Sequence, residues 1–169
     1  CLFEFIGTLV LVLLGDGVVA STVLKRSKGF DGGWIVITIA WGLAVMCGVL
    51  IAGPYSGAHL NPAVSVGLAA MAGSFPWAYV PGYVAAQLLG GFCGAVVVYL
   101  YYKDHFDATD DPAAKLGVFC TMPAIMDKPR NLFCEVVGTF LLVFVILAIG
   151  NEQNTPEIGM GSLGSLPVT

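Results

Sequence analysis

Residues 32–102 contain no Asp, Glu, Lys or Arg, and this uncharged stretch constrains the fold more than any other feature of the sequence. One membrane-spanning helix needs about 20 mostly apolar residues, so the stretch predicts more than one crossing. Its centre, the ten residues SGAHLNPAVS from Ser56 to Ser65, is interrupted by Gly and Pro and carries an amide side chain. Irregular backbone is tolerated at membrane depth only where protein buries it or where it lines a water-filled cavity. The sequence therefore predicts a pore or a substrate site inside the membrane.

The composition indicates that lipid is the solvent for much of this chain. Its 169 residues are 57% hydrophobic and 11% charged, whereas soluble domains carry about 25% charged residues. A soluble bundle of buried helices is thus the disfavoured alternative. The sequence has no basic patch with interleaved aromatic residues, so we expect no nucleic-acid partner. The five cysteines are odd in number and form no C-x-x-C motif, so we expect neither a disulfide framework nor a zinc site.

The hydropathy pattern predicts an all-α membrane protein with four full crossings and one half-crossing. The crossings are expected at residues 2–24, 34–52, 77–102 and 132–150. Gly53-Pro54 should end the second crossing, and an irregular segment should lead into a helix at 62–72 that is too short to span. Residues 103–130 are charged and rich in turn residues, which predicts a long extramembranous loop, and residues 151–164 form a polar connector.

The openings of the first and fourth crossings share a pattern, E-x-x-G-T, at Glu4 and Glu135. Three crossings separate the two starts, so the fourth crossing runs opposite to the first, as in an inverted-topology repeat. Helix-packing glycines alone are the simpler alternative. We expect a single transmembrane domain (1–169) in which 1–102 form the first repeat, 103–130 the connector and 131–169 the start of the second repeat. Because the chain lacks an initial Met and stops in what reads as another span, we expect a fragment without the second half-helix.

Asn61-Pro62 has the chemistry of a helix start. Asn is a favoured N-cap and Pro a favoured first helical residue. The unpaired N–H groups there carry a partial positive charge that would point at the membrane centre. The Asn61 side chain could cap the helix, or it could turn outward and offer its NH₂ to a pore. We expect it to turn outward instead of capping.

The motif SGAHLNPAVS resembles the first signature loop of the major intrinsic proteins, the aquaporin and glycerol-facilitator family, and the span order and the repeated E-x-x-G-T extend the resemblance over the whole chain. It implies an aquaporin-like right-handed helical bundle in which two re-entrant half-helices meet at the membrane centre. It implies that Asn61, followed by Pro62 and Ala63, donates hydrogen bonds to the permeating molecule. The acceptors would be backbone carbonyls, which map onto Gly57, Ala58, His59 and Leu60.

The resemblance also implies roles for residues in the helices. Trp41, with Val45 one turn later, falls at the narrowest part of the pore, where glycerol facilitators usually carry Trp and water-selective members usually carry Phe. A packing or interfacial Trp is the alternative. Glu4 and Glu135 would accept backbone N–H groups of the signature loops; an exposed acid and a proton relay are the alternatives. We expect Asp16 to be a solvated or capped group near the opposite interface.

These observations predict a passive channel for small neutral solutes, glycerol and water, and not an enzyme. We also expect no cofactor, because the permeation of a neutral solute needs no hydrolysis, redox step or nucleotide. The alternatives are a secondary transporter built from inverted repeats, a strictly water-selective channel and a structural membrane protein with a closed pore. The resemblance implies a multi-pass protein of the plasma (inner) membrane, a homotetramer in the lipid bilayer. All Lys and Arg residues lie in two connectors on one side, which the positive-inside rule places in the cytoplasm. The family places that side outside, and we follow the family.

Overall fold

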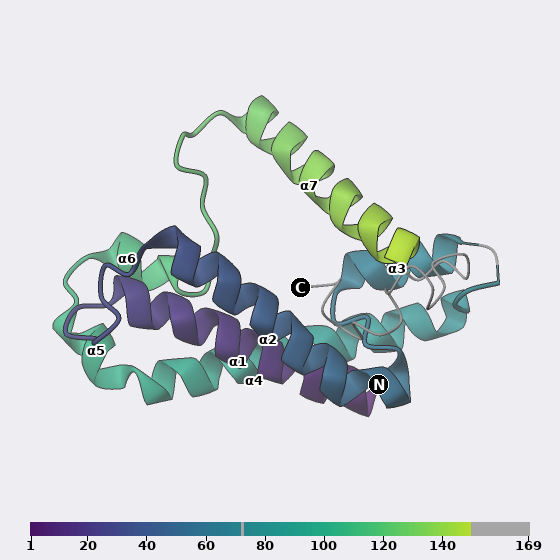
Figure 1. The fold of residues 1–169 in the computed structure, drawn as a ribbon, viewed down its shortest axis with the longest axis horizontal. Helices are drawn as coiled ribbons and strands as arrows, with labels where there is room; N and C mark the ends of the chain where they lie inside the picture. Colours follow the sequence, from purple (N-terminus) through teal and green to yellow (C-terminus); the bar gives the residue numbers. More distant parts are fainter. Residues whose placement is uncertain (72, 150–169) are drawn as a thin grey trace, which may run out of the picture.

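The computed structural model describes residues 1–71 and 73–149, and in these ranges every regular element is helical (Figure 1). The elements are α1 (Leu2–Val23), α2 (Gly33–Ser56), α3 (Pro62–Ala70), the 3₁₀ turn η1 (Trp77–Tyr79), α4 (Val80–Tyr101), α5 (Lys103–Ala108), α6 (Pro112–Gly117) and α7 (Lys128–Ile149). Four segments are long and apolar enough to cross a membrane, Leu2–Val23, Gly33–Ser56, Trp77–Tyr101 and Lys128–Ile149. The predicted all-α class, with four crossings and one short helix between the second and third, is confirmed.

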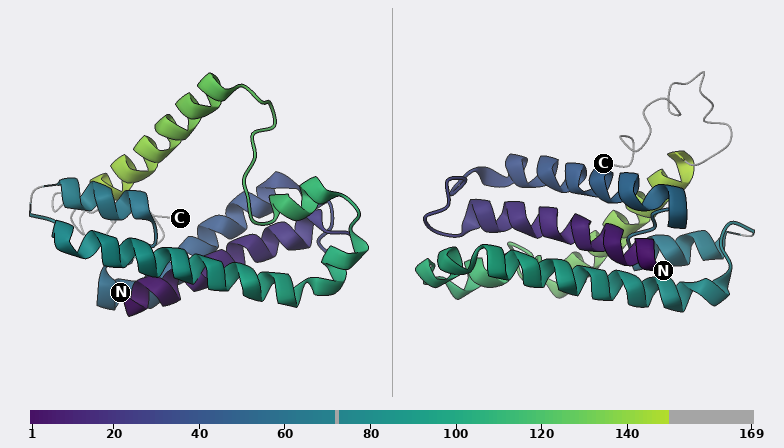
Figure 2. Two further views of the ribbon diagram at one scale, coloured as in Figure 1. Left: turned by 180° about the vertical axis from the view of Figure 1, so that it is seen from behind. Right: turned by 90° about the horizontal axis from the view of Figure 1, so that it is seen from below.

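Helix α1 lies between α2 and α4 in one layer, antiparallel to α2 and parallel to α4 (Figure 2). Glycines allow the close approach: a Cβ on Gly94 of α4 would lie 2.7 Å from the carbonyl oxygen of Leu9, and Gly90 meets the carbonyl of Phe5 in the same way. Side chains are excluded at such distances from a neighbouring backbone. The G-x-x-x-G spacing in α4 therefore serves helix packing, as small residues commonly do between membrane helices.

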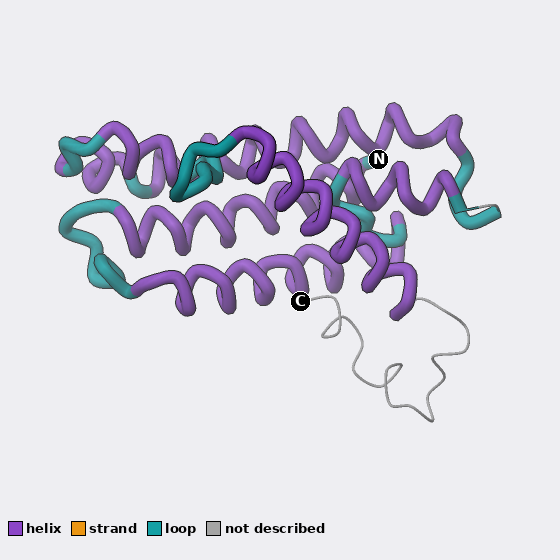
Figure 3. Tube along the Cα trace, turned by 90° about the horizontal axis from the view of Figure 1, so that it is seen from above, coloured by secondary structure: helices purple, strands orange, loops and turns teal. Residues whose placement is uncertain are grey.

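Helix α7 returns over this layer after the long connector (Figures 1 and 3). It contacts α3, where a Cβ on Gly67 would come within 2.7 Å of the Val143 side chain. All but a few residues of α7 are exposed. In this structure α7 therefore touches the layer chiefly through the half-helix.

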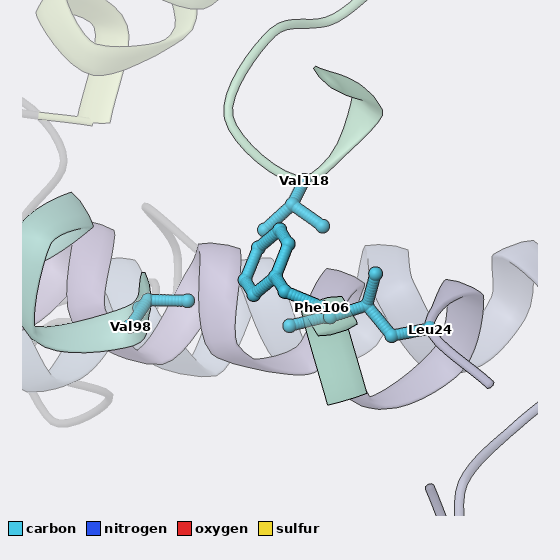
Figure 4. Close-up of a cluster of buried hydrophobic side chains, with 5 residues drawn as sticks. Leu24, Val98, Phe106 and Val118 are labelled. Atoms are coloured by element: carbon cyan, nitrogen blue, oxygen red, sulfur yellow. The ribbon is translucent and has the colours of Figure 1, made fainter. Parts of the chain in front are cut away.

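The connectors meet at one end of the layer and close it with a small apolar cluster (Figure 4). Leu24, Val98, Phe106 and Val118 are its largest buried members. Beside it, the Lys25 amide donates to Thr109 Oγ1 at 2.9 Å. The first and third connectors, which hold the positive charges, thus lie at the same end, as the crossing pattern predicts.

The structure corrects three of the predicted boundaries. Helix α2 continues through Pro54 to Ser56, because Pro54 falls in the last turn, and Gly57 then ends the helix in the left-handed conformation with φ of 81°. Helix α7 begins at Lys128 rather than at 132, and the connector predicted as a loop contains α5 and α6. Helix α3 ends at Ala70. Residue 72 and the predicted connector 151–164 lie outside the described residues.

Candidate functional site in the re-entrant segment

The start of α3 is capped by Asn61. Its backbone is extended, with φ of −149° and ψ of 128°, and its Oδ1 accepts the Ala63 N–H at 2.8 Å. The expectation that the side chain turns outward instead of capping is therefore wrong, because one carboxamide can do both. Oδ1 serves the cap, while Nδ2 donates to no other described residue. Among the described residues that are not exposed, the side-chain polar atoms with neither a partner nor accessible surface are Thr8 Oγ1 and Gln87 Oε1. Asn61 Nδ2 is not among them, so it is accessible.

A second cap in the same chain shows what the capping function alone requires. Helix α6 begins with Asp111-Pro112-Ala113, and Asp111 Oδ1 accepts the Ala113 N–H at 2.9 Å. The hydrogen bond is the same as in Asn61-Pro62-Ala63, and both cap residues are extended, although their φ angles differ (−75° for Asp111 and −149° for Asn61). Capping thus accepts Asp as readily as Asn. What Asn61 adds is an uncharged NH₂ donor beside the helix N-terminus.

The segment before Asn61 has an unusual backbone. Gly57, Ala58 and Leu60 all have positive φ, at 81°, 48° and 53°. For Ala and Leu this left-handed conformation costs roughly 1–2 kcal/mol per residue. The conformation must therefore be held by bonds from outside the segment.

Glu4 of α1 supplies those bonds. Its Oε1 accepts the His59 N–H at 3.0 Å, and its Oε2 accepts the Leu60 N–H at 2.8 Å. Across a planar trans peptide the C=O points opposite to the next N–H, and the described part of the chain has no cis peptide bond. The carbonyls of Ala58 and His59 consequently point away from Glu4.

Each oxygen of the Glu4 carboxylate also accepts a second hydrogen bond. Ser56 Oγ donates to Oε1 at 2.6 Å, and Gln87 Nε2 donates to Oε2 at 2.8 Å. The side chain is fully buried. A buried carboxylate is costly unless hydrogen-bonded, and here four donors from α1's neighbours satisfy it. This arrangement favours a structural charge over a proton relay.

The side chains of the segment are fixed as well. His59 Nδ1 lies 3.1 Å from Ser65 Oγ, and the His59 ring packs against Phe75 and Tyr83. Gln87 Nε2 also donates to Ser65 Oγ at 3.0 Å. His59 therefore braces the loop, and the described residues contain no group of His, Cys, Asp or Glu that could hold a metal ion.

Leu60 is anchored at both its backbone and its side chain. A Cβ on Gly7 would lie 2.6 Å from Leu60 Cδ2, and one on Gly48 would lie 2.8 Å from Leu60 Cδ1. The Leu60 side chain thus occupies a notch between α1 and α2 that only glycine leaves open. In α1 the Glu and the Gly of E-x-x-G-T both hold this one residue, a relationship that the sequence pattern did not reveal.

Trp41 of α2 borders a cavity of about 440 Å³. Its ring lies directly against Gly15 of α1. Leu60 and Pro62 line the same cavity, whereas Val45 is half-buried and does not. The structure therefore brings Trp41 and the re-entrant segment to one space.

Asp16 also lines this cavity. Only 7% of its surface is exposed, so the expectation of a solvated group is wrong. Its expected position toward the opposite interface stays a prediction. The position of Asp16 along α1 predicts its depth in the membrane, but the rotation of the helix sets the direction of its side chain. Thr8 and Asp16 are about two turns apart on one face of α1, and this spacing could have indicated that the Asp16 side chain points to the same side as Thr8.

Glu135 is exposed and borders a second cavity of about 620 Å³ together with Ala63 of α3. It makes no hydrogen bond or ion pair with the part of the chain that the structure describes. The structure therefore does not give Glu135 the contacts that Glu4 has.

Comparison with known proteins gives a consistent set of relatives. The chain is 56% identical over 152 residues to a Thermotoga maritima protein named a probable glycerol uptake facilitator, covering 90% of this chain and 64% of that protein. It is 50% identical over 165 residues to the glycerol uptake facilitator protein of Bacillus subtilis, covering 98% and 60%. It is 53% identical over 163 residues to glycerol uptake facilitator protein 3 of Lactiplantibacillus plantarum, covering 96% and 68%.

The chain thus spans somewhat less than two thirds of the length of the first two of these relatives. The family model of the major intrinsic proteins matches residues 1–168. Together with the four membrane-length helices, this match makes the chain part of an integral membrane protein. The chain belongs to the major intrinsic protein family.

Proposed function

We propose that the protein containing this chain is a passive channel for small neutral solutes, glycerol above all, together with water. The observation that carries the proposal is the bonding of the His59 and Leu60 amides to Glu4. It turns the carbonyls of Ala58 and His59 away from Glu4, and Asn61, which follows in the same segment, keeps an accessible Nδ2. A solute that loses bulk water in single file needs such acceptors and donors in return, while the remaining wall can stay apolar.

In this proposal Gly57, Ala58, His59 and Leu60 present carbonyl acceptors, and Asn61 presents the amide donor. Pro62 and Ala63 begin the half-helix whose N-terminus carries partial positive charge. That charge raises the barrier for cations and protons. Glu4 holds the acceptors in place, and Glu135 would do the same for a second loop.

Trp41 supports a polyol channel over a strictly water-selective one. Its ring forms an apolar wall of the cavity that reaches Leu60 and Pro62. Such a wall suits the carbon backbone of glycerol while polar groups bind its hydroxyls. Val45, one turn after Trp41, would contact the solute outside this cavity. The names of the relatives, glycerol uptake facilitators in three bacteria, support the same solute.

The alternative of a secondary transporter is less well supported. Transporters place coupling ions at midplane sites formed by broken helices. Here the carboxylate nearest the break, Glu4, is saturated by four donors. We also propose that the protein is a homotetramer of the plasma membrane, that residues 1–102 are its first repeat, and that it has no catalytic activity.

The test is solute flux in liposomes that contain the full-length protein. The expected result is glycerol efflux that rises linearly with the gradient and is unaffected by proton or sodium gradients. Saturation at low concentration, or acceleration by an ion gradient, would establish a transporter instead. Water flux without glycerol flux would establish a strictly water-selective channel.

A further inference from the structure

Asp16 is the one buried charged group of the described helices that the function proposed above does not use. It lies on the face of α1 that carries Thr8, and only 7% of its surface is exposed. Glu4, the other buried acid of this helix, has four donors. Asp16 has none among the described residues.

The oxygens of Asp16 are open to space rather than sealed. The buried side-chain polar atoms that lack both a partner and accessible surface are Thr8 Oγ1 and Gln87 Oε1, and neither Asp16 oxygen is among them. Asp16 lines the cavity of about 440 Å³, so its accessible oxygens can receive donors from that space. A carboxylate at membrane depth is costly unless donors approach it, so the contents of the cavity must supply them.

An apolar aromatic surface lies beside the Asp16 carboxylate. Gly15, the preceding residue, lies against the ring of Trp41, and both Trp41 and Asp16 line the cavity. The cavity thus offers two hydrogen-bond acceptor oxygens next to a flat aromatic wall. A carboxylate forms its strongest neutral-ligand bonds with O–H donors. Two hydroxyls on adjacent carbons can reach its two oxygens together.

We propose that Asp16 and Trp41 form a binding subsite for vicinal diols, in which Asp16 accepts two neighbouring hydroxyls and Trp41 contacts the carbon chain. The inference rests on the proposed function and deepens it, because it makes Asp16 a specificity-determining residue for polyols. Water and solutes with isolated hydroxyls make only single bonds to the same carboxylate and depend on it less.

The experiment compares the full-length protein with Asp16→Asn and Asp16→Leu in liposomes, after the leak of protein-free liposomes is subtracted. Permeability is measured for glycerol, for 1,3-propanediol, whose hydroxyls are not vicinal, and for water. The matched control is Asp31→Asn, the same chemical change at an exposed acid with a backbone φ of 63° that Asn also adopts.

The expected result is that both Asp16 variants lower the ratio of glycerol to 1,3-propanediol permeability by about tenfold, the size of effect that losing a charge-assisted hydrogen bond allows, while Asp31→Asn leaves it unchanged. A ratio that is unchanged or raised would overturn the proposal. Failure of the unmodified protein to conduct glycerol would instead refute the proposed function.

Melting temperature separates ligand binding from a structural role. An unpartnered buried carboxylate destabilises the fold, so Asp16→Leu, similar in size and apolar, is expected to melt at the same or a higher temperature. If Asp16→Leu and Asp16→Asn both melt several degrees lower, another part of the protein binds the carboxylate, and the subsite does not exist.

Discussion

The carboxylate of Glu4 accepts the backbone N–H of Leu60 at 2.8 Å, and so ties the first membrane helix to a loop 56 residues later in the sequence. Leu60 has a left-handed backbone with φ of 53°, which an isolated Leu avoids. The same carboxylate holds His59 and thereby orients two consecutive peptide groups. The shape of the proposed conducting segment therefore depends on one buried acid.

Replacing Glu4 with Gln should disrupt the segment more than the small change in size suggests. Each Glu4 oxygen accepts two donors. Gln offers one oxygen and one NH₂ group. The two donors that approach the position of the NH₂ group would therefore meet a donor instead of an acceptor. Hydrogen bonds to charged groups contribute about 1.5–3 kcal/mol each. We expect a lower melting temperature and at least tenfold lower glycerol flux, measured on the purified protein and in liposomes. Near-normal flux would show that Glu4 does not hold the segment.

Much of this arrangement could be predicted from the sequence, because the solvent dictates it. The uncharged stretch and the Gly/Pro break predict crossings and a re-entrant helix from hydrogen-bonding requirements alone. The start of α3 at Pro62 follows from local capping chemistry.

Other features depended on tertiary contacts that local patterns do not specify. Pro54 reads as a helix breaker, but at the last turn of α2 it is tolerated because the helix ends at Ser56. The direction of Asp16 follows from how α1 rotates to place Gly7 against Leu60. The short helices α5 and α6 form in a connector whose residues pack on Leu24 and Val98.

Gly7→Ala tests the notch that holds Leu60. Ala favours a helix over Gly by up to about 1 kcal/mol, but a Cβ on Gly7 would lie 2.6 Å from Leu60 Cδ2 and 2.9 Å from Ala52 Cβ. We expect lower thermal stability and lower glycerol flux. The control is Gly17→Ala in the same helix, where no atom lies within 4 Å of the added Cβ. It should leave flux unchanged and stability equal or higher, and equal behaviour of the two variants would argue against the notch.

Asn61→Asp separates the two functions of the Asn61 side chain. Asp caps a Pro-Ala helix start in α6 through the same side-chain hydrogen bond, and a negative charge at a helix N-terminus is favourable. Helix α3 should therefore form normally. The variant loses the Nδ2 donor and gains an acceptor, so we expect a well-folded protein with at least tenfold lower glycerol flux. Unchanged melting with unchanged flux would mean that Asn61 only caps the helix.

Trp41→Ala tests the apolar wall of the cavity. Removing the ring enlarges the space between α2 and Gly15 of α1, because the ring fills the gap that Gly15 leaves. We expect solutes larger than glycerol, such as four- and five-carbon polyols, to gain permeability relative to glycerol by several-fold. Liposome flux with a series of polyols measures this selectivity. Trp34→Ala is the matched control, because Trp34 is 75% exposed at the start of α2 and lines neither described cavity. If Trp41→Ala keeps the same size selectivity as Trp34→Ala, the narrowest point of the path lies elsewhere, and Trp41 is a packing residue.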